Sequence, residues 1–256
     1  MTESRIADEI KEPTILRKRE ERQTSPHDRR AKYSITGLLA LLVFTIVLGL
    51  FIPKYSDLYI FGYIMAIVYS IAGPMHGKVP WSDLGIRRGF VKDFKKVWYY
   101  FAIDAILFQL LPPTLGVAFL FGYYPQLLQH ITGRLATDFG GAITLNATLL
   151  GILGLTAVLT LMEELVFRVT IQQRLSWFLG TPAAIAAATI VFGLAHAVGA
   201  TGILSLTALD VAGVMLDGVF FGIVFAKTKN LAVTWATHYV ADVVGIIALV
   251  TVLAII

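Results

Sequence analysis

The segment 161–168, with the sequence LMEELVFR, places Glu163, Glu164 and Arg168 inside residues 141–175, a stretch that is otherwise mainly apolar. About 20 apolar residues are enough for a helix to cross the hydrocarbon core of a bilayer. Charged side chains at that depth are costly and are usually kept for function. The stretch therefore predicts a membrane helix that carries functional groups.

The overall composition agrees with a membrane protein. Of 256 residues, 57% are hydrophobic and 15% are charged, whereas a soluble domain carries about 25% charged residues. Because a helix satisfies its own backbone hydrogen bonds in lipid, we expect an all-α polytopic membrane protein. The chain contains no cysteine, which excludes disulfides and a cysteine nucleophile.

About seven transmembrane helices are expected, and they should enclose a polar intramembrane cavity. The predicted spans are approximately 33–52, 58–74, 97–111, 141–175, 183–198, 206–226 and 231–256. The apolar stretch 114–129 is interrupted by glycine and proline, so we expect it to be an outer or re-entrant segment. Counting it as a span would place later basic residues outside, against the positive-inside rule.

The first 33 residues are polar and rich in charge. We expect residues 1–33 to form a largely disordered cytoplasmic tail, and residues 34–256 to form the membrane-embedded domain. The loop 78–96 is basic and should also lie in the cytoplasm. The prediction is a multi-pass protein of the cell membrane with its N-terminus inside. Interleaved acidic residues in the tail argue against nucleic acid as a partner.

Ionisable residues recur in two later apolar segments, as Phe192–His196 and His238–Asp242. At ~1.5 Å of helix rise per residue, Glu163, His196 and His238 lie roughly 12–21 Å from the predicted inner turns. Helix tilt can absorb the difference, so we expect the three side chains to meet in one layer of the membrane. A carboxylate one turn from a histidine, as in His238–Asp242, can fix the histidine tautomer.

The order Glu-Glu-x-x-x-Arg, Phe-x-x-x-His and His-x-x-x-Asp on successive hydrophobic segments resembles the CPBP family of intramembrane proteases. This family includes the type II CAAX prenyl endopeptidases. The resemblance covers approximately residues 81–242. It implies a glutamate-dependent endopeptidase whose partners are the lipid bilayer and a membrane-anchored peptide or protein substrate, which could be a prenylated CAAX-type sequence.

The resemblance also implies a role for each motif residue. A water molecule would be held and activated by Glu163 and His196, and the oxyanion would be stabilised by His238 and Asp242. The remaining motif residues would support the site: Glu164 as an assisting carboxylate, Arg168 as a brace for the carboxylates and Phe192 as a packing residue. CAAX endopeptidases carry asparagine where this chain has Asp242. An ionised aspartate would repel an oxyanion, so Asp242 should be protonated or should orient His238.

Three alternatives remain open from the sequence. A non-catalytic family member, such as a bacteriocin-immunity or scaffold protein, could keep the same residues for packing. An ion-coupled transporter could also bury Glu and His, but no inverted repeat is visible. Two histidines and a glutamate could bind Zn²⁺; because no His-Glu-x-x-His helix is present, we expect no metal and no other cofactor.

The membrane depth of the three motifs also holds Asp104, Asp210 and Asp217, of which Asp217 could touch the site.

Overall fold

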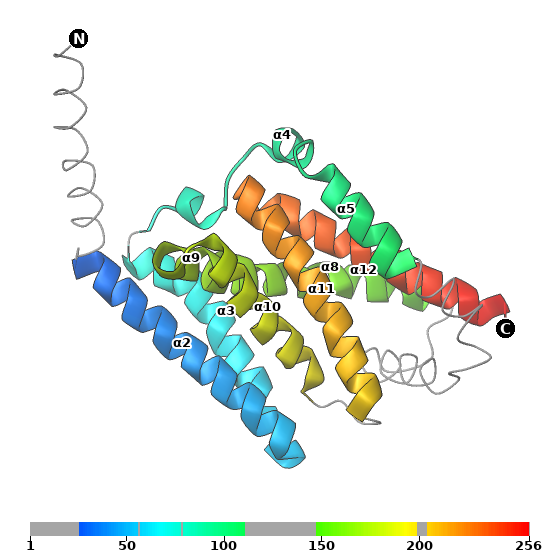
Figure 1. Cartoon of the computed structure of the whole chain (residues 1–256), viewed down its shortest axis with the longest axis horizontal. Helices are drawn as coiled ribbons and strands as arrows, with labels where there is room; N and C mark the ends of the chain where they lie inside the picture. Colours follow the sequence, from blue (N-terminus) through cyan, green and yellow to red (C-terminus); the bar gives the residue numbers. More distant parts are fainter. Residues whose placement is uncertain (1–25, 56, 78, 111–146, 199–203, 256) are drawn as a thin grey trace, which may run out of the picture.

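The computed structural model describes residues 26–55, 57–77, 79–110, 147–198 and 204–255, and these residues form helices and turns but no strand. The first described element is α2 (Pro26–Phe51), which packs against α3 (Asp57–Gly77) as an antiparallel pair (Figure 1). Residues 26–33, which the sequence assigned to the tail, form the first two turns of α2. The predicted outer stretch 114–129 lies outside the described residues.

The remaining helices follow the predicted spans closely. The third span consists of α5 (Trp98–Asp104) and a π-helical continuation (Ala105–Leu110), and it is preceded by the short α4 (Phe90–Phe94). The fourth is one long helix made of α8 (Ala147–Glu163), a π-helical segment (Glu164–Gln172) and α9 (Gln173–Leu179). The last three are α10 (Thr181–Ala197), α11 (Leu204–Thr228) and α12 (Leu231–Ile255).

The described helices confirm an all-α polytopic membrane protein. Four of them are long and apolar enough to cross a membrane, namely 57–75, 149–179, 210–228 and 231–248, and 35–51, 98–107 and 181–197 form shorter apolar helices. Together they cover the seven segments expected from the sequence. The boundaries differ by a few residues; for example, α3 continues through Pro74 to Gly77. A proline near a helix end removes one hydrogen bond only and can be accommodated there.

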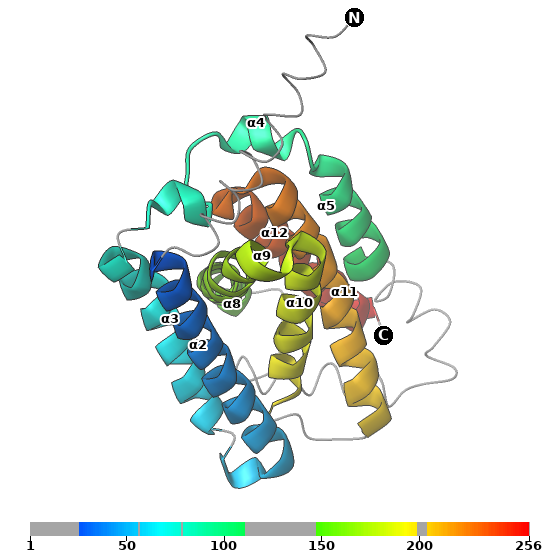
Figure 2. The same ribbon diagram turned by 60° about the vertical axis from the view of Figure 1, so that its left-hand side comes forward.

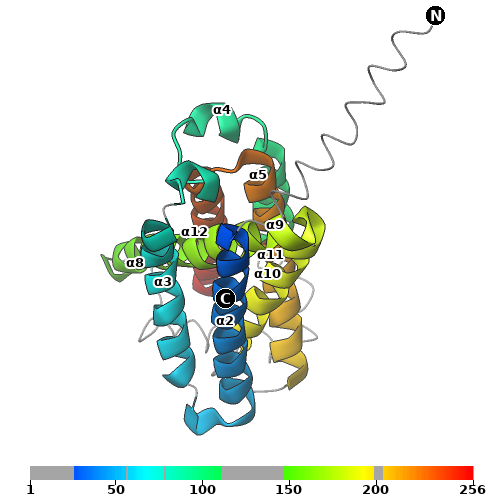
Figure 3. The same ribbon diagram turned by 90° about the vertical axis from the view of Figure 1, so that its left-hand side faces the viewer.

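One end of the bundle gathers the segments that the sequence places in the cytoplasm. The start of α2, α4, α9 and the turn between α11 and α12 all lie at this end (Figures 2 and 3). The opposite ends of α2, α10 and α11 point away from it. The charge pattern predicts that these segments lie on the same side of the membrane, and they do lie at the same end of the bundle. That this end faces the cytoplasm stays a prediction.

Small residues allow α10 and α11 to approach closely. A Cβ atom added at Gly193 would come within 2.4 Å of Met215, and one added at Gly218 would lie 3.1 Å from Phe192. Glycine at such positions lets two membrane helices pack backbone to backbone. The packing places the helix that carries His196 directly against the helix that carries Asp217.

The connection between α3 and α5 is bonded to the turn between α11 and α12. The backbone N–H of Leu231 donates to the carbonyl of Gly85 at 2.7 Å, and Nε of Arg87 donates to the carbonyl of Lys229 at 2.8 Å. Gly85 has a φ of 85°, a left-handed conformation that favours glycine. A Cβ there would also lie 2.7 Å from the Phe225 ring. These contacts hold the first residues of α12 in place.

Asp93 is the charged centre of the same connection. Its buried carboxylate pairs with Arg87 at 2.6 Å and with Lys96 at 2.8 Å, and it accepts a hydrogen bond from Nδ2 of Asn230 at 3.1 Å. Burial acts to raise the pKa of Asp93, but the bonds from Lys96 and Asn230 and the charge of Arg87 outweigh it and hold that pKa below its usual value. Two basic residues of the predicted loop thus have internal partners that position α12.

Candidate active site

The Glu163–Arg168 motif lies where the long helix changes from α to π geometry, immediately after Glu163. All nine residues of the π-helical segment Glu164–Gln172 are buried. Hydrogen bonds in a π-helix span five residues instead of four, and such segments are frequent at functional sites. The directions of the side chains that follow Glu163 therefore differ from those of the regular α-helix that the sequence analysis assumed.

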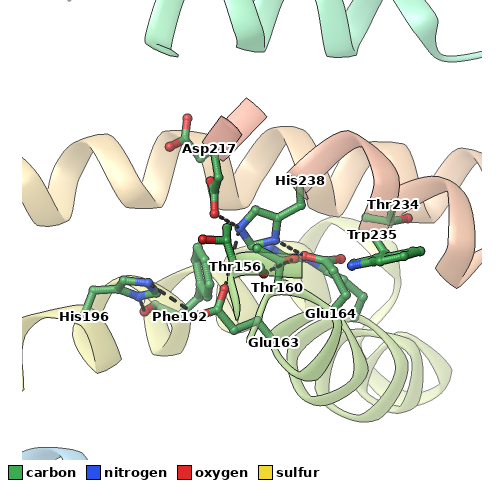
Figure 4. Close-up of polar contacts among 12 residues, drawn as sticks. Thr156, Thr160, Glu163, Glu164, Phe192, His196, Asp217, Thr234, Trp235 and His238 are labelled. Carbon is green, nitrogen blue, oxygen red and sulfur yellow. Dashed lines mark hydrogen bonds and ion pairs between the residues drawn. The ribbon is translucent and has the colours of Figure 1, made fainter. Parts of the chain in front are cut away.

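His238 lies at the centre of the candidate site, between the two glutamates (Figure 4). Its Nδ1 is 2.9 Å from Oε1 of Glu164, and its Nε2 is 3.6 Å from Oε2 of Glu163 and 3.7 Å from Oδ2 of Asp242. The Phe221 ring stacks on the imidazole with 4.2 Å between centroids. Because a carboxylate only accepts hydrogen bonds, Nδ1–H donates to Glu164, and Nε2 faces Glu163 and Asp242.

Glu163 also faces the second histidine. Oε1 of Glu163 is 3.8 Å from Nε2 of His196, whereas Nδ1 of His196 is 2.8 Å from the carbonyl oxygen of Phe192. A carbonyl only accepts, so Nδ1 carries the proton in the neutral ring. A separation of 3.8 Å is too long for a direct hydrogen bond and leaves these two atoms able to share a water molecule.

The two glutamates differ in their access to solvent. The side chain of Glu163 is 23% exposed and that of His196 is 25% exposed, whereas the side chain of Glu164 is fully buried. Asp242 is 33% exposed and His238 only 4%. One side of the cluster is thus accessible, and the other is enclosed by protein.

Arg168 pairs with Glu164 on the enclosed side, as the sequence predicted. Nε of Arg168 is 3.3 Å from Oε2 of Glu164, and both side chains are fully buried. The guanidinium carbon lies 5.2 Å from the ring centroid of Phe192 and 6.0 Å from that of Phe221. Among the described residues, Glu164 is the only acidic side chain that forms an ion pair with Arg168.

Phe192 packs as expected, at the junction of the three motifs. Its ring meets the rings of Phe167, His196 and His238 at centroid distances of 5.0, 4.6 and 5.9 Å. A side-chain hydrogen bond also joins two of the surrounding helices: Nε1 of Trp235 on α12 donates to the carbonyl of Ala157 on α8 at 2.9 Å. The site is therefore assembled by packing between α8, α10 and α12 as well as by its charges.

The structure brings together all the predicted site residues, namely Glu163, Glu164, Arg168, Phe192, His196, His238 and Asp242. Their catalytic roles stay a prediction. The sequence analysis missed the bond from His238 to Glu164. It placed Asp104 at membrane depth but did not connect it with the site, where Asp104 interacts with Asp217, His238 and Asp242. Its presence at membrane depth was the available signal. The described residues contain no group of three or more His, Cys, Asp or Glu side chains that could hold a metal ion.

Comparison with known proteins agrees with this geometry. Residues 143–244 match the family model described as type II CAAX prenyl endopeptidase Rce1-like, and this segment contains all three motifs. Through this segment the chain is similar to the CPBP family of CAAX proteases. No curated protein and no solved structure matches the chain. The match supports, in general terms, a membrane protease that acts on a membrane-associated substrate.

Proposed function

We propose that the chain is a glutamate-dependent intramembrane endopeptidase that hydrolyses a peptide bond in a membrane-anchored substrate. The observation that carries the proposal is the position of Glu163 between two histidines. Its carboxylate oxygens lie 3.8 Å from Nε2 of His196 and 3.6 Å from Nε2 of His238. A general base must reach its proton directly or through one water, and Glu163 lies on the accessible side of the cluster.

In the first step, a water molecule bridges Oε1 of Glu163 and Nε2 of His196. Glu163 accepts one proton of the water while the water oxygen bonds to the carbonyl carbon of the scissile peptide. His196 accepts a hydrogen bond from the same water at Nε2, because its Nδ1–H is held by the Phe192 carbonyl. The product of the step is a tetrahedral intermediate with a negatively charged oxygen.

The second part of the proposal assigns the stabilisation of that oxyanion to His238 and Asp242. Glu164 holds the Nδ1–H of His238, so a protonated ring presents Nε2–H toward the accessible side. Donors aimed at a developing charge in a water-poor site are worth more than donors in bulk water. Collapse of the intermediate breaks the C–N bond, and the proton held by Glu163 passes to the departing amine.

For the substrate, the family match supports a prenylated CAAX-type peptide. A purified preparation in liposomes would be given two fluorogenic peptides of the same sequence, one prenylated and one not. We expect cleavage of the prenylated peptide and its loss in Glu163→Gln, which removes the base and keeps the side-chain shape. Asp57→Asn, a change of charge on the exposed first turn of α3, is the matched control and should keep activity. Full cleavage by a correctly folded Glu163→Gln variant would rule out the glutamate mechanism.

A further inference from the structure

The connection 79–98 carries five basic and two acidic residues, and its cations are divided between two sides. Arg87 and Lys96 bond inward, to the carboxylate of Asp93 at 2.6 and 2.8 Å, and Arg87 also bonds to the carbonyl of Lys229. These bonds hold the turn that precedes α12. Two of the five cations are therefore used within the protein.

The other three cations, Arg88, Lys92 and Lys95, lie on the outward side of the connection. All three are exposed, and in the described part of the chain their side chains form no ion pair and no hydrogen bond. Lys92 lies in α4 and Lys95 follows three residues later, directly after the helix, a spacing that makes them neighbours on one face. The exposed acid of the connection is Asp83. The outward side therefore carries an excess of positive charge.

Exposed apolar side chains lie among these three cations. Val91 is 65% exposed and Trp98 is 56% exposed, and Phe90 is also exposed while its ring stacks on that of Phe94 with 5.9 Å between centroids. Tryptophan is enriched where a membrane meets water, and the stems of lysine side chains can lie along apolar surface while the ammonium groups reach a polar layer. This mixture of cations and apolar side chains fits the boundary between lipid headgroups and acyl chains.

The position of this surface along the chain also agrees with the headgroup layer. Trp98 begins the apolar helix 98–107, and Lys95 lies three residues before it, so their Cα atoms are within ~11 Å of each other. α4 lies at the outer edge of this end of the bundle (Figures 1 and 3). Lysine and arginine side chains that lie directly beside a membrane span attract anionic lipids.

We propose that the outward side of this connection binds the headgroups of anionic phospholipids in the adjacent leaflet. Its cations contact the lipid phosphates, and its apolar side chains enter the acyl boundary. The inward side of the same connection is bonded to Lys229 and Leu231, so lipid bound outside also stabilises the start of α12. The lipid-binding patch consists of Arg88, Phe90, Val91, Lys92, Lys95 and Trp98.

Quenching of tryptophan fluorescence in liposomes measures the lipid preference at the patch. Phosphatidylcholine liposomes would receive increasing fractions of brominated phosphatidylglycerol or, in parallel, brominated phosphatidylcholine. The signal of Trp98 is the difference between each protein and the same protein with Trp98→Phe. We expect phosphatidylglycerol to quench Trp98 more strongly at equal fractions, with a preference that weakens as the salt concentration rises. Equal quenching by the two lipids at low salt would overturn the proposal.

The triple variant Arg88→Gln/Lys92→Gln/Lys95→Gln removes the three charges and keeps polar side chains. Its preference for phosphatidylglycerol should fall by about 100-fold, a factor of about five for each cation. The matched control, Arg88→Lys/Lys92→Arg/Lys95→Arg, keeps every charge and should keep the preference. Lys54→Gln, in the turn between α2 and α3 at the opposite end of the bundle, should also have no effect. An unchanged preference in the folded triple variant would contradict the proposal.

Single variants decide the question if the triple variant does not fold. Each of Arg88→Gln, Lys92→Gln and Lys95→Gln should lower the preference for phosphatidylglycerol by about fivefold. If none of the three single variants lowers it, the patch does not bind anionic headgroups.

Thermal unfolding in detergent distinguishes a lipid from a soluble anionic partner. Added phosphatidylglycerol should raise the Tm of the wild type more than phosphatidylcholine does, because a ligand that binds the folded state stabilises it, and it should not do so in the triple variant. Polyphosphate carries similar charges without acyl chains. If polyphosphate raises the Tm as much as phosphatidylglycerol, and Val91→Ser changes neither effect, the partner is a soluble anion and the proposal is wrong. Neither measurement requires a substrate, so both are independent of the protease mechanism.

Discussion

Nδ1 of His238 lies 2.9 Å from Oε1 of Glu164, and this contact determines which nitrogen of the ring faces Glu163. Glu164 is held in turn by Arg168 through its other oxygen at 3.3 Å. The ion pair and the histidine thus share one buried carboxylate. The chain of contacts from Arg168 through Glu164 to His238 links the stability of the bundle to the chemistry of the site.

Glu164→Gln should impair the chemical step more than substrate binding. The amide cannot stabilise a protonated His238 as a carboxylate does, so the Nε2–H donor would be lost. Removing one oxyanion donor typically lowers kcat about 10²–10³-fold, and we expect a loss of that order with a small change in KM. Steady-state kinetics on the prenylated peptide provide the measurement. Wild-type kcat in Glu164→Gln would contradict the assigned role of His238.

Arg168→Ala should act first on stability. It leaves Glu164 as an unpaired charge in a fully buried position, and breaking a buried pair commonly costs about 3–5 kcal/mol. We expect a clear fall in Tm and in expression, measured by thermal unfolding in detergent. Arg88→Ala, on the exposed loop before α4, is the matched control and should leave Tm within a degree or two. An unchanged Tm in Arg168→Ala would show that the pair is not a stabilising element.

The convergence of Glu163, His196 and His238 could be predicted from the sequence because depth along a membrane helix follows from a fixed rise per residue. The turns near residues 180 and 230 provided the reference points. Which side chains touch at that depth depends on the rotation of each helix about its axis, which packing decides. For this reason the bond between His238 and Glu164 could not be predicted, while the i,i+4 pair Glu164–Arg168 could.

Two other features could not be predicted from the local sequence. The π-helical segment that starts at Glu164 has no marker in the local sequence, since its residues would also suit a regular α-helix. Arg87 was interpreted as a loop charge that sets topology, yet it binds the backbone at Lys229, 142 residues away. A charge pattern predicts the side of the membrane on which a loop lies, but not the partner of an individual charge.

Asp93 makes the stability of the protein sensitive to acid. Its folded-state pKa lies below the ordinary value of 3.8, so its pairing stabilises the fold above that pH. The contribution is lost as the pH falls below 3.8 toward the folded-state value. Asp93→Asn should lower stability by about 1–3 kcal/mol at neutral pH, and the gap to the wild type should close below about pH 4. Thermal unfolding across this pH range is the measurement, with Asp57→Asn as the control. A stability difference between Asp93→Asn and the wild type that does not depend on pH would contradict the role given to the Asp93 carboxylate.

The orientation of the bundle can be tested with reporters. The end that carries α4, α9 and the α11–α12 turn should face the cytoplasm, because basic residues gather on those segments. A cytoplasmic reporter fused to the N-terminus should be active, and one fused after α12 should be active only outside. Reporters that place both ends on the same side would show that the segment 114–129 crosses the membrane.

The shared water of the mechanism predicts that Glu163 and His196 act as one unit. Glu163→Gln removes the base, and His196→Ala removes the second acceptor of the same water. Each change alone should therefore nearly abolish cleavage, and the double variant should be little worse than either, because residues that act as a unit are strongly non-additive. The measurement is kcat/KM for the three variants and the wild type in liposomes, with Tm recorded in parallel to show that all four are folded. If the two losses of activity multiply in the double variant, the two side chains do not share one water. Glu163 and His196, whose Oε1 and Nε2 atoms lie 3.8 Å apart, would then act in separate steps of the reaction.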